Sequence, residues 1–281
     1  MREVASLRYG VIFKKAFSEP DIFKAFVRDI LGIKLEIDRV ETEKSFAESI
    51  GNIHLVYDLF AEDTKNRIIV DIQHVRYTDH YHRFLHYHCA ALLEQAVKCN
   101  HYRPDRTVYT IVVLTSGDRH QTDVSVIDFD PKTLDGKPLK EIDHRIMYLC
   151  PKYLNANTPP LYREWLRAIN DSLDEQVDET SYSIPEVKKI FSLIQKDLLS
   201  PIERTRIMDE YRHSDYGEEK FNEGVKKGIQ QGIEQGIKQG SINIAQTLLS
   251  KGLDIKLISE ATGFSAAEIA NLANLSIGVT Q

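Results

Sequence analysis

The chain has 281 residues, of which 42% are hydrophobic and 28% charged, a balance that supports a normal globular core and excludes wholesale disorder. Its three cysteines show no Cys-x-x-Cys spacing, which excludes a disulfide framework and a zinc ribbon and favours a reducing compartment. There is no secretory signal at the start and no apolar run long enough to cross a bilayer, so we expect a cytoplasmic protein without a membrane partner.

The formal net charge of -6 is unevenly distributed. Residues 65–119 hold eight Lys/Arg against five Asp/Glu, an excess of three positive charges, together with six of the ten histidines. Residues 171–223 hold seven Lys/Arg against fourteen Asp/Glu, an excess of seven negative charges. The acidity therefore belongs to a later segment than the candidate chemistry, although an excess of three charges also fits a mildly uneven surface.

The first half of the chain predicts an alternation of helices and strands. Apolar residues recur at helical spacing over 12–31, and Pro20 divides this stretch into two helices, the second ending at Gly32. A nearly continuous apolar run at 108–114 is typical of a strand at the centre of a sheet. Strands are expected at 37–40, 53–60, 67–73, 108–114, 124–129 and 146–149, and a long helix at 81–98.

Helices dominate after Trp165. Ser183 and Glu186 have the spacing of a capping box that would begin a helix. Between residues 221 and 240 glycine recurs at every fourth position, and Val or Ile follows the first four glycines. Such a helix fits self-association through close packing, and equally a semi-flexible linker. Three short helices are expected at 242–249, 255–261 and 266–272, with Ser265 as the N-cap of the last.

This order of elements predicts an α/β domain with a helical extension. The expected domains are an α/β domain at 1–170, an acidic helical linker at 171–220, the Gly-Ile repeat helix at 221–240 and a small helical tail at 241–281.

Two aspartates and a glutamine are the first candidates for chemistry. Asp71 and Gln73 point to the same face of a strand because strand side chains alternate. An antiparallel hairpin that carried Asp58 on the neighbouring strand would bring two carboxylates to one place. Carboxylate and backbone oxygens are the ligands that Mg²⁺ prefers, and Mg²⁺ polarises a phosphodiester and lowers the pKa of a bound water. The same spacing also fits an amphipathic hairpin with both aspartates in solvent.

The order of these motifs resembles the PD-(D/E)XK nuclease-type transposases, also called recombination-promoting nucleases. The resemblance implies a PD-(D/E)XK restriction-endonuclease-like core, with a mixed central sheet flanked by helices and an α-helical C-terminal extension. It also implies a metal-dependent DNA endonuclease that uses Mg²⁺ or another divalent cation, and the family name links it to recombination or transposition. The likeness rests on residues 9–17, 57–63, 67–73 and 108–114, on Arg83, Tyr87, Glu94, Gln95 and Tyr102, and on the Gly-Ile repeat with its helical tail.

The resemblance also implies roles for single residues. Asp58 and Asp71 would be catalytic metal ligands, and the carbonyl of Ile72 would be a third ligand. Gln73, the third catalytic residue, stands where the superfamily usually has lysine. A neutral amide can orient a water molecule but brings no positive charge to the reaction.

A second departure from the family pattern is Gly10, since relatives often place an acid just before the Phe-Lys motif. Glu19 and Asp21 are the nearby acids to which a metal-binding role would then fall.

One predicted helix carries Arg83, Tyr87 and Gln95, which the resemblance assigns to substrate binding. Arg83 and Gln95 would hold a phosphate or the metal-bound water. From the residues alone, Arg83 is as well explained as a surface side chain and Gln95 as an incidental polar residue. His82 and His86 on the same helix have metal-binding spacing but lack the glutamate of a zinc-protease motif, so they are expected to flank the site.

Residues 257–265 resemble a helix-turn-helix. The supposed recognition helix at 266–275 holds no Lys or Arg, which favours a protein contact and homo-oligomerisation through the tail over direct reading of DNA. Two other functions stay open. A catalytically degenerate nuclease fold would bind DNA or protein only, as Gln73 and Gly10 suggest, and an oligomerising scaffold would make the tail the main function.

Overall fold

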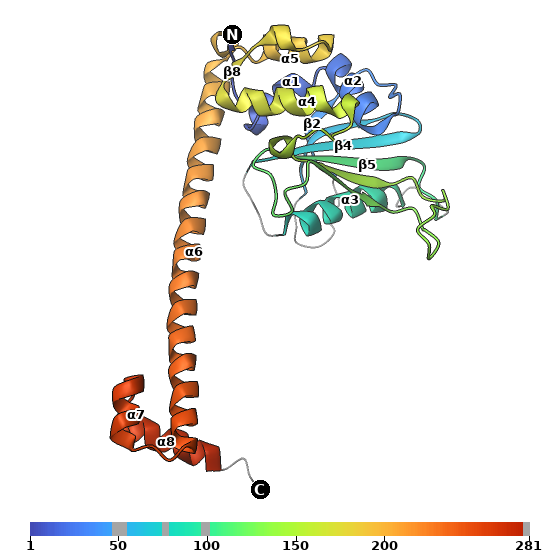
Figure 1. Cartoon of the computed structure of the whole chain (residues 1–281). Helices are drawn as coiled ribbons and strands as arrows, with labels where there is room; N and C mark the ends of the chain where they lie inside the picture. The colour runs from blue at the N-terminus through green and yellow to red at the C-terminus, as the bar shows by residue number, and fades with distance from the viewer. Residues whose placement is uncertain (47–54, 75–78, 97–101, 278–281) are drawn as a thin grey trace. The chain divides into compact units, whose positions relative to one another are not determined.

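The computed structural model describes residues 1–46, 55–74, 79–96 and 102–277, and Figure 1 shows its secondary structure. The chain divides into two compact units, Met1–Asp215 and Tyr216–Gln281. A search of the described helices finds none that could span a membrane. The predicted strand start at 53–54 and helix end at 97–98 lie outside the described residues.

A mixed six-stranded sheet forms the centre of the first unit, in the order β2-β3-β4-β5-β7-β6. The three middle strands β4, β5 and β7 run parallel, and the other pairs are antiparallel. As predicted, the apolar strand β5 is central and almost wholly buried. The strands are β2 (Glu41–Lys44), β3 (Tyr57–Glu62), β4 (Asn66–Gln73), β5 (Thr107–Leu114), β6 (Val124–Asp128) and β7 (Arg145–Leu149), with β1 (Arg2–Glu3) and β8 (Gln176–Val177) forming a separate ladder.

Helices cover both faces of this sheet (Figure 1). The helices α1, α2, α4 and α5 lie on one face, and α3 lies on the other. The mixed α/β class is therefore confirmed, whereas the PD-(D/E)XK assignment of this core stays a prediction. The helices are α1 (Gly10–Phe17), α2 (Pro20–Leu31), α3 (His80–Ala96), α4 (Pro160–Asp171) and α5 (Pro185–Leu193), with short 3-10 turns at Pro151–Tyr153, Ser172–Asp174, Glu179–Ser181 and Lys196–Leu198.

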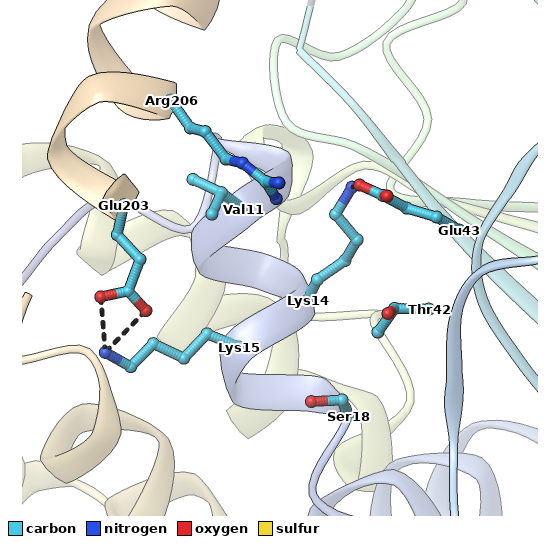
Figure 2. Close-up of a pocket in the computed structure, with 8 residues that line it drawn as sticks. All are labelled: Val11, Lys14, Lys15, Ser18, Thr42, Glu43, Glu203 and Arg206. Carbon is cyan, nitrogen blue, oxygen red and sulfur yellow. Dashed lines mark hydrogen bonds and ion pairs between the residues drawn. The ribbon is translucent and has the colours of Figure 1, made fainter. Parts of the chain in front are cut away.

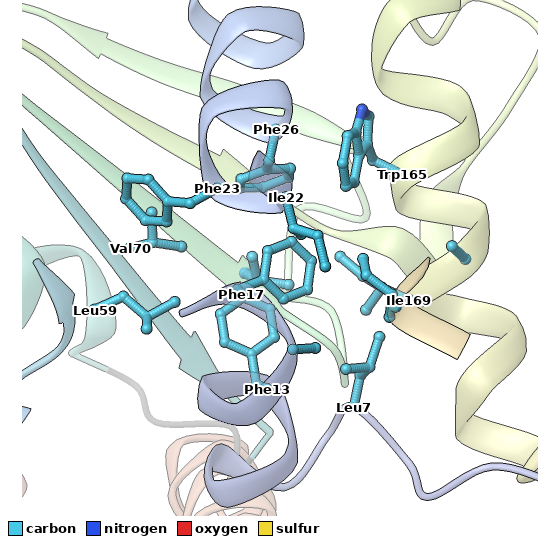
Figure 3. Close-up of a cluster of buried hydrophobic side chains, with 14 of the residues drawn as sticks. Leu7, Phe13, Phe17, Ile22, Phe23, Phe26, Leu59, Val70, Trp165 and Ile169 are labelled. Carbon is cyan, nitrogen blue, oxygen red and sulfur yellow. The ribbon is translucent and has the colours of Figure 1, made fainter. Parts of the chain in front are cut away.

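Aromatic side chains from three helices fill the core between the sheet and the larger helical layer (Figure 3). Phe13 stacks on Phe17 with ring centroids 4.3 Å apart, and Phe26 meets Phe17 and Trp165 edge-on at 5.1 and 5.3 Å. The Trp165 indole donates a hydrogen bond to the buried Asp29 carboxylate at 2.8 Å, so both polar groups are satisfied. This packing fixes α1 against β3 and β4.

The edge strand begins later than predicted. Residues 37–40 form no strand, and Ile37 and Val40 pack against the core from an irregular segment. These two residues are three positions apart, a spacing that does not match the two-residue period of a strand. The strand β2 follows at Glu41–Lys44 and pairs with β3.

Residues 171–215 belong to the first unit, so the predicted domain boundary at 170 and the linker after it are wrong. The strand β8 pairs with β1, and α5 packs on α1 and α2. Over residues 171–212 the acidic residues are exposed or partly buried and none lies in the core, which explains the linker-like composition. The buried residues of this segment are Val177, Tyr182, Val187, Ile190, Phe191 and Ile194.

The capping box predicted at Ser183 is also wrong. The helix α5 begins at Pro185 with Ile184 as its N-cap, and no side chain caps it. The backbone N–H groups of Ser183 and Ile184 donate instead to the Glu164 carboxylate of α4, at 2.7 and 2.5 Å. A carboxylate on a neighbouring helix has therefore replaced the local cap.

The helix α6 (Pro201–Ser250) runs through the Gly-Ile repeat. The glycines of the repeat have open space where a Cβ would lie. The apolar residues of the repeat are exposed by 42% to 65% and form what we call the apolar row: Val225, Ile229, Ile233 and Ile237. Because four residues slightly exceed one helical turn, this row lies along one side of the helix.

The end of α6 packs with α7 (Ile255–Thr262) and α8 (Ala266–Ile277) around Ala245, Ile258 and Ile269. The first of the three predicted short helices is therefore the end of α6. The capping residue Ser265 is confirmed, because its hydroxyl accepts from Glu268 N–H and its own N–H donates to the Glu268 carboxylate.

We predict that the apolar row mediates self-association of the full-length chain. Changing Ile229 and Ile233 together to Asp should convert the assembly to monomers, because burying two carboxylates at a helix–helix contact is costly. Light scattering would measure the molar mass in solution. The matched control changes Gln231 and Gln235 to Asp, which adds the same charge on another side of the helix. Equal molar masses for the two variants would contradict the prediction.

Candidate functional site

Two aspartates face each other where the strands β3 and β4 separate. The last backbone pair between the strands is Leu59 with Val70. Beyond it, side chains take over the pairing: Asp58 N–H donates to Asp71 Oδ1 at 3.2 Å, and Ile72 N–H donates to Asp58 Oδ2 at 3.1 Å. The predicted convergence of Asp58 and Asp71 on neighbouring antiparallel strands is therefore what the structure shows.

Both carboxyl groups are held in an unfavourable setting for negative charge. Burial raises the pKa of Asp71 well above its usual range, and the neighbouring Asp58 carboxylate raises it further. Burial also raises the pKa of Asp58, although Lys14 acts in the opposite direction. Asp71 is 4% exposed, so solvent relieves little of this repulsion. Such a pair is suited to a cation or a shared proton.

Lys14 of α1 forms an ion pair with Asp58. Its Nζ lies 3.6 Å from Asp58 Oδ1 and 3.0 Å from Glu43 Oε1, and its side chain is 17% exposed. Glu43 belongs to the edge strand β2. Sequence reasoning placed Lys14 only within a family motif and gave it no role, because its contact with Asp58 depends on how α1 packs on the sheet.

Arg83 and Tyr87 flank the pair from α3, on the other face of the sheet. Arg83 Nη2 donates to the Tyr87 hydroxyl at 3.2 Å, and Tyr57 anchors that region through a hydrogen bond to the Tyr87 carbonyl. The positive charge of Arg83 is among the influences that lower the pKa of Asp71 and Asp58. The structure thus brings Arg83 near the carboxylates and places Tyr87 against it.

Gln73 lies on β4 two residues after Asp71, and its side chain is buried. Alternation of side chains along a strand gives it the same face as Asp71. The predicted grouping of Asp71 and Gln73 on one face therefore agrees with the strand that the structure shows.

Gln95 is not brought to this site. Its side chain accepts from Arg106 N–H at 2.9 Å and donates to the Arg106 carbonyl at 3.3 Å, just before β5 begins. The register pairs Thr107 with Asn66, five residues from Asp71 along β4, which corresponds to roughly 16 Å. Gln95 therefore holds α3 against the residue just before β5, away from the position beside the aspartates that the family resemblance implied for it.

The acid that is missing at Gly10 has a spatial counterpart. Glu210 of α6 accepts hydrogen bonds from Gly10 N–H at 2.7 Å and Val11 N–H at 3.2 Å, and so caps the start of α1. Glu19 and Asp21 do not fill that place, because both pair with Lys189 of α5. No sequence signal links positions 10 and 210, which are brought together only by the docking of α6.

The residues present fit a divalent cation in three respects. Asp71 Oδ2 is buried and accepts no hydrogen bond from any residue that the structure describes, which leaves one carboxylate oxygen available. The charge repulsion between Asp58 and Asp71 would be relieved by a cation. The Ile72 N–H faces β3, and its carbonyl shares that direction because both groups of a strand residue point to the same neighbour. Within the described residues no group of three His, Cys, Asp or Glu side chains has metal-binding geometry, so a cation here would need backbone or water ligands.

The histidines near the site do not form a metal cluster within the described residues. His82 and His86 are exposed on α3. His88 is buried in the core, where its Nδ1 bonds the Thr110 hydroxyl at 2.9 Å and its ring stacks on Phe129. Burial lowers the pKa of His88 to about 3, so this ring is a neutral packing residue.

Comparison with known proteins gives one match, in the second unit. Residues 238–274 match the C-terminal HTH domain of the Rpn/YhgA-like nuclease family. This agrees with the helix-turn-helix expected from the sequence and supports a relation to that nuclease family, without testing the core that holds Asp58 and Asp71. No curated protein and no solved structure matches the chain.

The raised pKa of Asp71 gives a prediction for stability against pH. The folded chain holds this proton more tightly than the unfolded chain, in which the pKa is about 3.9. This contribution to the free energy of unfolding is complete below the unfolded-state pKa and is lost as the pH rises through the folded-state pKa. In Asp71→Asn the side chain has no ionisable group, so this loss of stability with rising pH does not occur.

In chelator, Asp71→Asn should therefore become more stable relative to the natural chain as the pH rises from about 5 to about 8, by on the order of 1 kcal/mol or more. Urea unfolding at several pH values would measure the difference. Asp128→Asn, on the opposite edge strand β6, is the control. A stability difference for Asp71→Asn that does not change with pH would contradict the assignment.

Proposed function

We propose that the first unit is a Mg²⁺-dependent DNA endonuclease. The observation that carries the proposal is the pair of the partly buried Asp58 and the buried Asp71, whose carboxyl groups replace the strand ladder and repel each other. The match of residues 238–274 to a domain of a nuclease family supports the same reaction class. Bringing two carboxyl groups this close is costly for the fold, and a divalent cation bound between them would offset that cost.

Asp58, Asp71 and the Ile72 carbonyl would hold the ion. When bound, Mg²⁺ polarises the phosphodiester and lowers the pKa of a water. Gln73 would orient the attacking water through its amide, since it adds no charge of its own. Arg83 would hold a phosphate oxygen with its guanidinium, and Tyr87 would fix the position of Arg83 through the 3.2 Å hydrogen bond.

The natural chain should nick supercoiled plasmid in Mg²⁺, and Asp71→Asn should not. Loss of a direct ligand is expected to reduce the rate by more than the roughly 10- to 100-fold that follows loss of an outer partner of a metal site. Gel electrophoresis of nicked product over time measures the rate. Asp128→Asn, prepared in the same way, should keep full activity. Equal nicking by the natural chain and Asp71→Asn would identify a contaminant and end the proposal.

The alternative is a degenerate nuclease fold that binds DNA or protein without cleavage. Two observations favour it: Gln73 brings no charge to the pair, and Gly10 supplies no acid. The two functions differ in their demand for a metal, because only hydrolysis requires the carboxylate pair to bind Mg²⁺.

Calorimetric titration of the full chain with Mg²⁺ should therefore separate them. We expect one binding event that is lost in both Asp58→Asn and Asp71→Asn and retained in Asp128→Asn. Mg²⁺ affinity should rise with pH, because the ion competes with the proton that the raised pKa of Asp71 holds. A titration without any binding that depends on these aspartates would favour the binding-only fold.

The helix-turn-helix in the tail would add a second contact. Residues 238–274 hold three lysines against three carboxylates, and the exposed start of α8 presents Ala266, Ala267 and Glu268. Phosphate binding is favoured by an excess of positive charge, and the net charge of this module is zero. We therefore propose that the tail brings chains together, and that DNA contact rests chiefly on the first unit.

A further inference from the structure

A cavity of about 370 Å³ opens between α1, β2 and the beginning of α6, within the first unit (Figure 2). Lys14 connects this cavity to the carboxylate pair, because it lines the cavity and its Nζ lies 3.6 Å from Asp58 Oδ1. The cavity is therefore adjacent to the candidate reaction centre. Three of its lining residues are cations and two are acids: Lys14, Lys15, Arg206, Glu43 and Glu203.

The charges in this cavity are not balanced. Lys15 pairs with Glu203 at 2.9 Å, and Lys14 pairs with Glu43 at 3.0 Å. Arg206 forms no ion pair with any residue that the structure describes. Figure 2 shows its side chain extending from α6 into the cavity, towards Lys14 and Glu43. The charge of Arg206 is among those that lower the pKa of Glu43, and its guanidinium lines the cavity where an anion from outside the chain could bind.

The ligand that suits this arrangement is a phosphodiester. A guanidinium gives paired hydrogen bonds to a phosphate, and the neighbouring lysine ammonium groups add charge without fixing an orientation. The cavity borders a carboxylate pair that we propose acts on a phosphodiester, so a strand lying across that pair would place another phosphate of its backbone here.

We propose that this cavity binds the backbone phosphate of a nucleic-acid strand next to the bond to be cleaved, through Arg206, Lys15 and Lys14. Lys14, which reaches both the cavity and Asp58, supplies to the reacting phosphate the positive charge that position 73 lacks. This role rests on the proposed nuclease function, whereas the binding of a strand by Arg206 stands without cleavage.

Salt dependence of DNA binding tests the cavity. Full-length chain is titrated with a fluorescent oligonucleotide in chelator at several salt concentrations, and anisotropy gives the affinity. Arg206→Ala should weaken binding roughly tenfold and reduce the slope of log affinity against log salt by about 0.7 to 0.9, the change for one lost phosphate contact. Arg212→Ala, an exposed arginine on the same helix outside the cavity, should change the slope little.

An unchanged slope in Arg206→Ala, an equal loss in Arg212→Ala, or the absence of DNA binding by the natural chain would each overturn the cavity assignment. None of these results depends on plasmid nicking. A chain that nicks DNA only with Asp71 intact but shows an unchanged slope keeps the proposed function and loses the cavity. A chain that shows the slope change without nicking loses the nuclease function and the role of Lys14, and keeps the cavity as a DNA contact.

The role of Lys14 is tested by moving its charge. Lys14→Gln should lower kcat for nicking on the order of 10²-fold. Gln73→Lys in the same chain should restore at least about tenfold, because it returns a cation to the carboxylate pair. A purely structural Lys14 predicts no restoration. Thermal unfolding of both variants verifies that they fold, and a failure of Gln73→Lys to restore kcat in a folded chain overturns this role.

Discussion

The arrangement of the first unit depends on how the antiparallel pair β3–β4 ends. Hydrogen bonding between the two backbones stops after Leu59 and Val70, and the carboxylates of Asp58 and Asp71 occupy the space between the strands. Each carboxylate accepts a backbone N–H from the other strand, so the separation satisfies donors that would otherwise be lost. As a result two carboxyl groups, one buried and one partly buried, lie close together, and the surrounding elements place Lys14 and Arg83 near them.

Those elements hold the pair from two sides. On one face, the contact of Phe17 with Phe26 and Trp165 seats α1 on the sheet and sets the reach of Lys14. On the other face, α3 carries Arg83. The parallel partner β5 pairs with β4 along its whole length, so Asp71 stands on an interior strand while Asp58 stands on β3, next to the edge strand β2. A site built in this way is held in place before any ligand arrives.

Local patterns predicted the elements and the pair, but not what lies around the pair. The Asp58 and Asp71 spacing, the alternation on β4 and the apolar run of β5 all depend on neighbours within one hairpin or one strand, and all agree with the structure. The Glu210 cap on α1 and the Arg206 side chain in the cavity depend on α6 returning to α1, about two hundred residues along the chain. The sequence also did not place Gln95. Its position on the helix indicates which side of α3 it faces, but not which part of the sheet that end of α3 lies against.

The same limit explains the misplaced domain boundary. The acidic charge between residues 171 and 223 is real, yet Val187, Ile190 and Phe191 within it complete the core beneath α1 and α2. The composition of a segment counts the residues on both faces of a helix or strand, whereas only one face needs to be apolar for the element to pack in the core. The start of α5 is a further case. The sequence predicted a local cap there, but the Glu164 carboxylate of α4 accepts the backbone N–H groups instead.

The tetrad repeat of α6 has a consequence for how this chain tolerates changes in length. Four residues of α-helix advance by about 6 Å and turn by about 400°, so gaining or losing one Gly-Ile unit shifts the following residues by only about 40° around the axis. A change of one residue would turn them by about 100°. Whole-unit expansion or contraction would therefore keep Ile229 and its neighbours in register with an identical helix, while changing the reach of the tail in steps of a single turn.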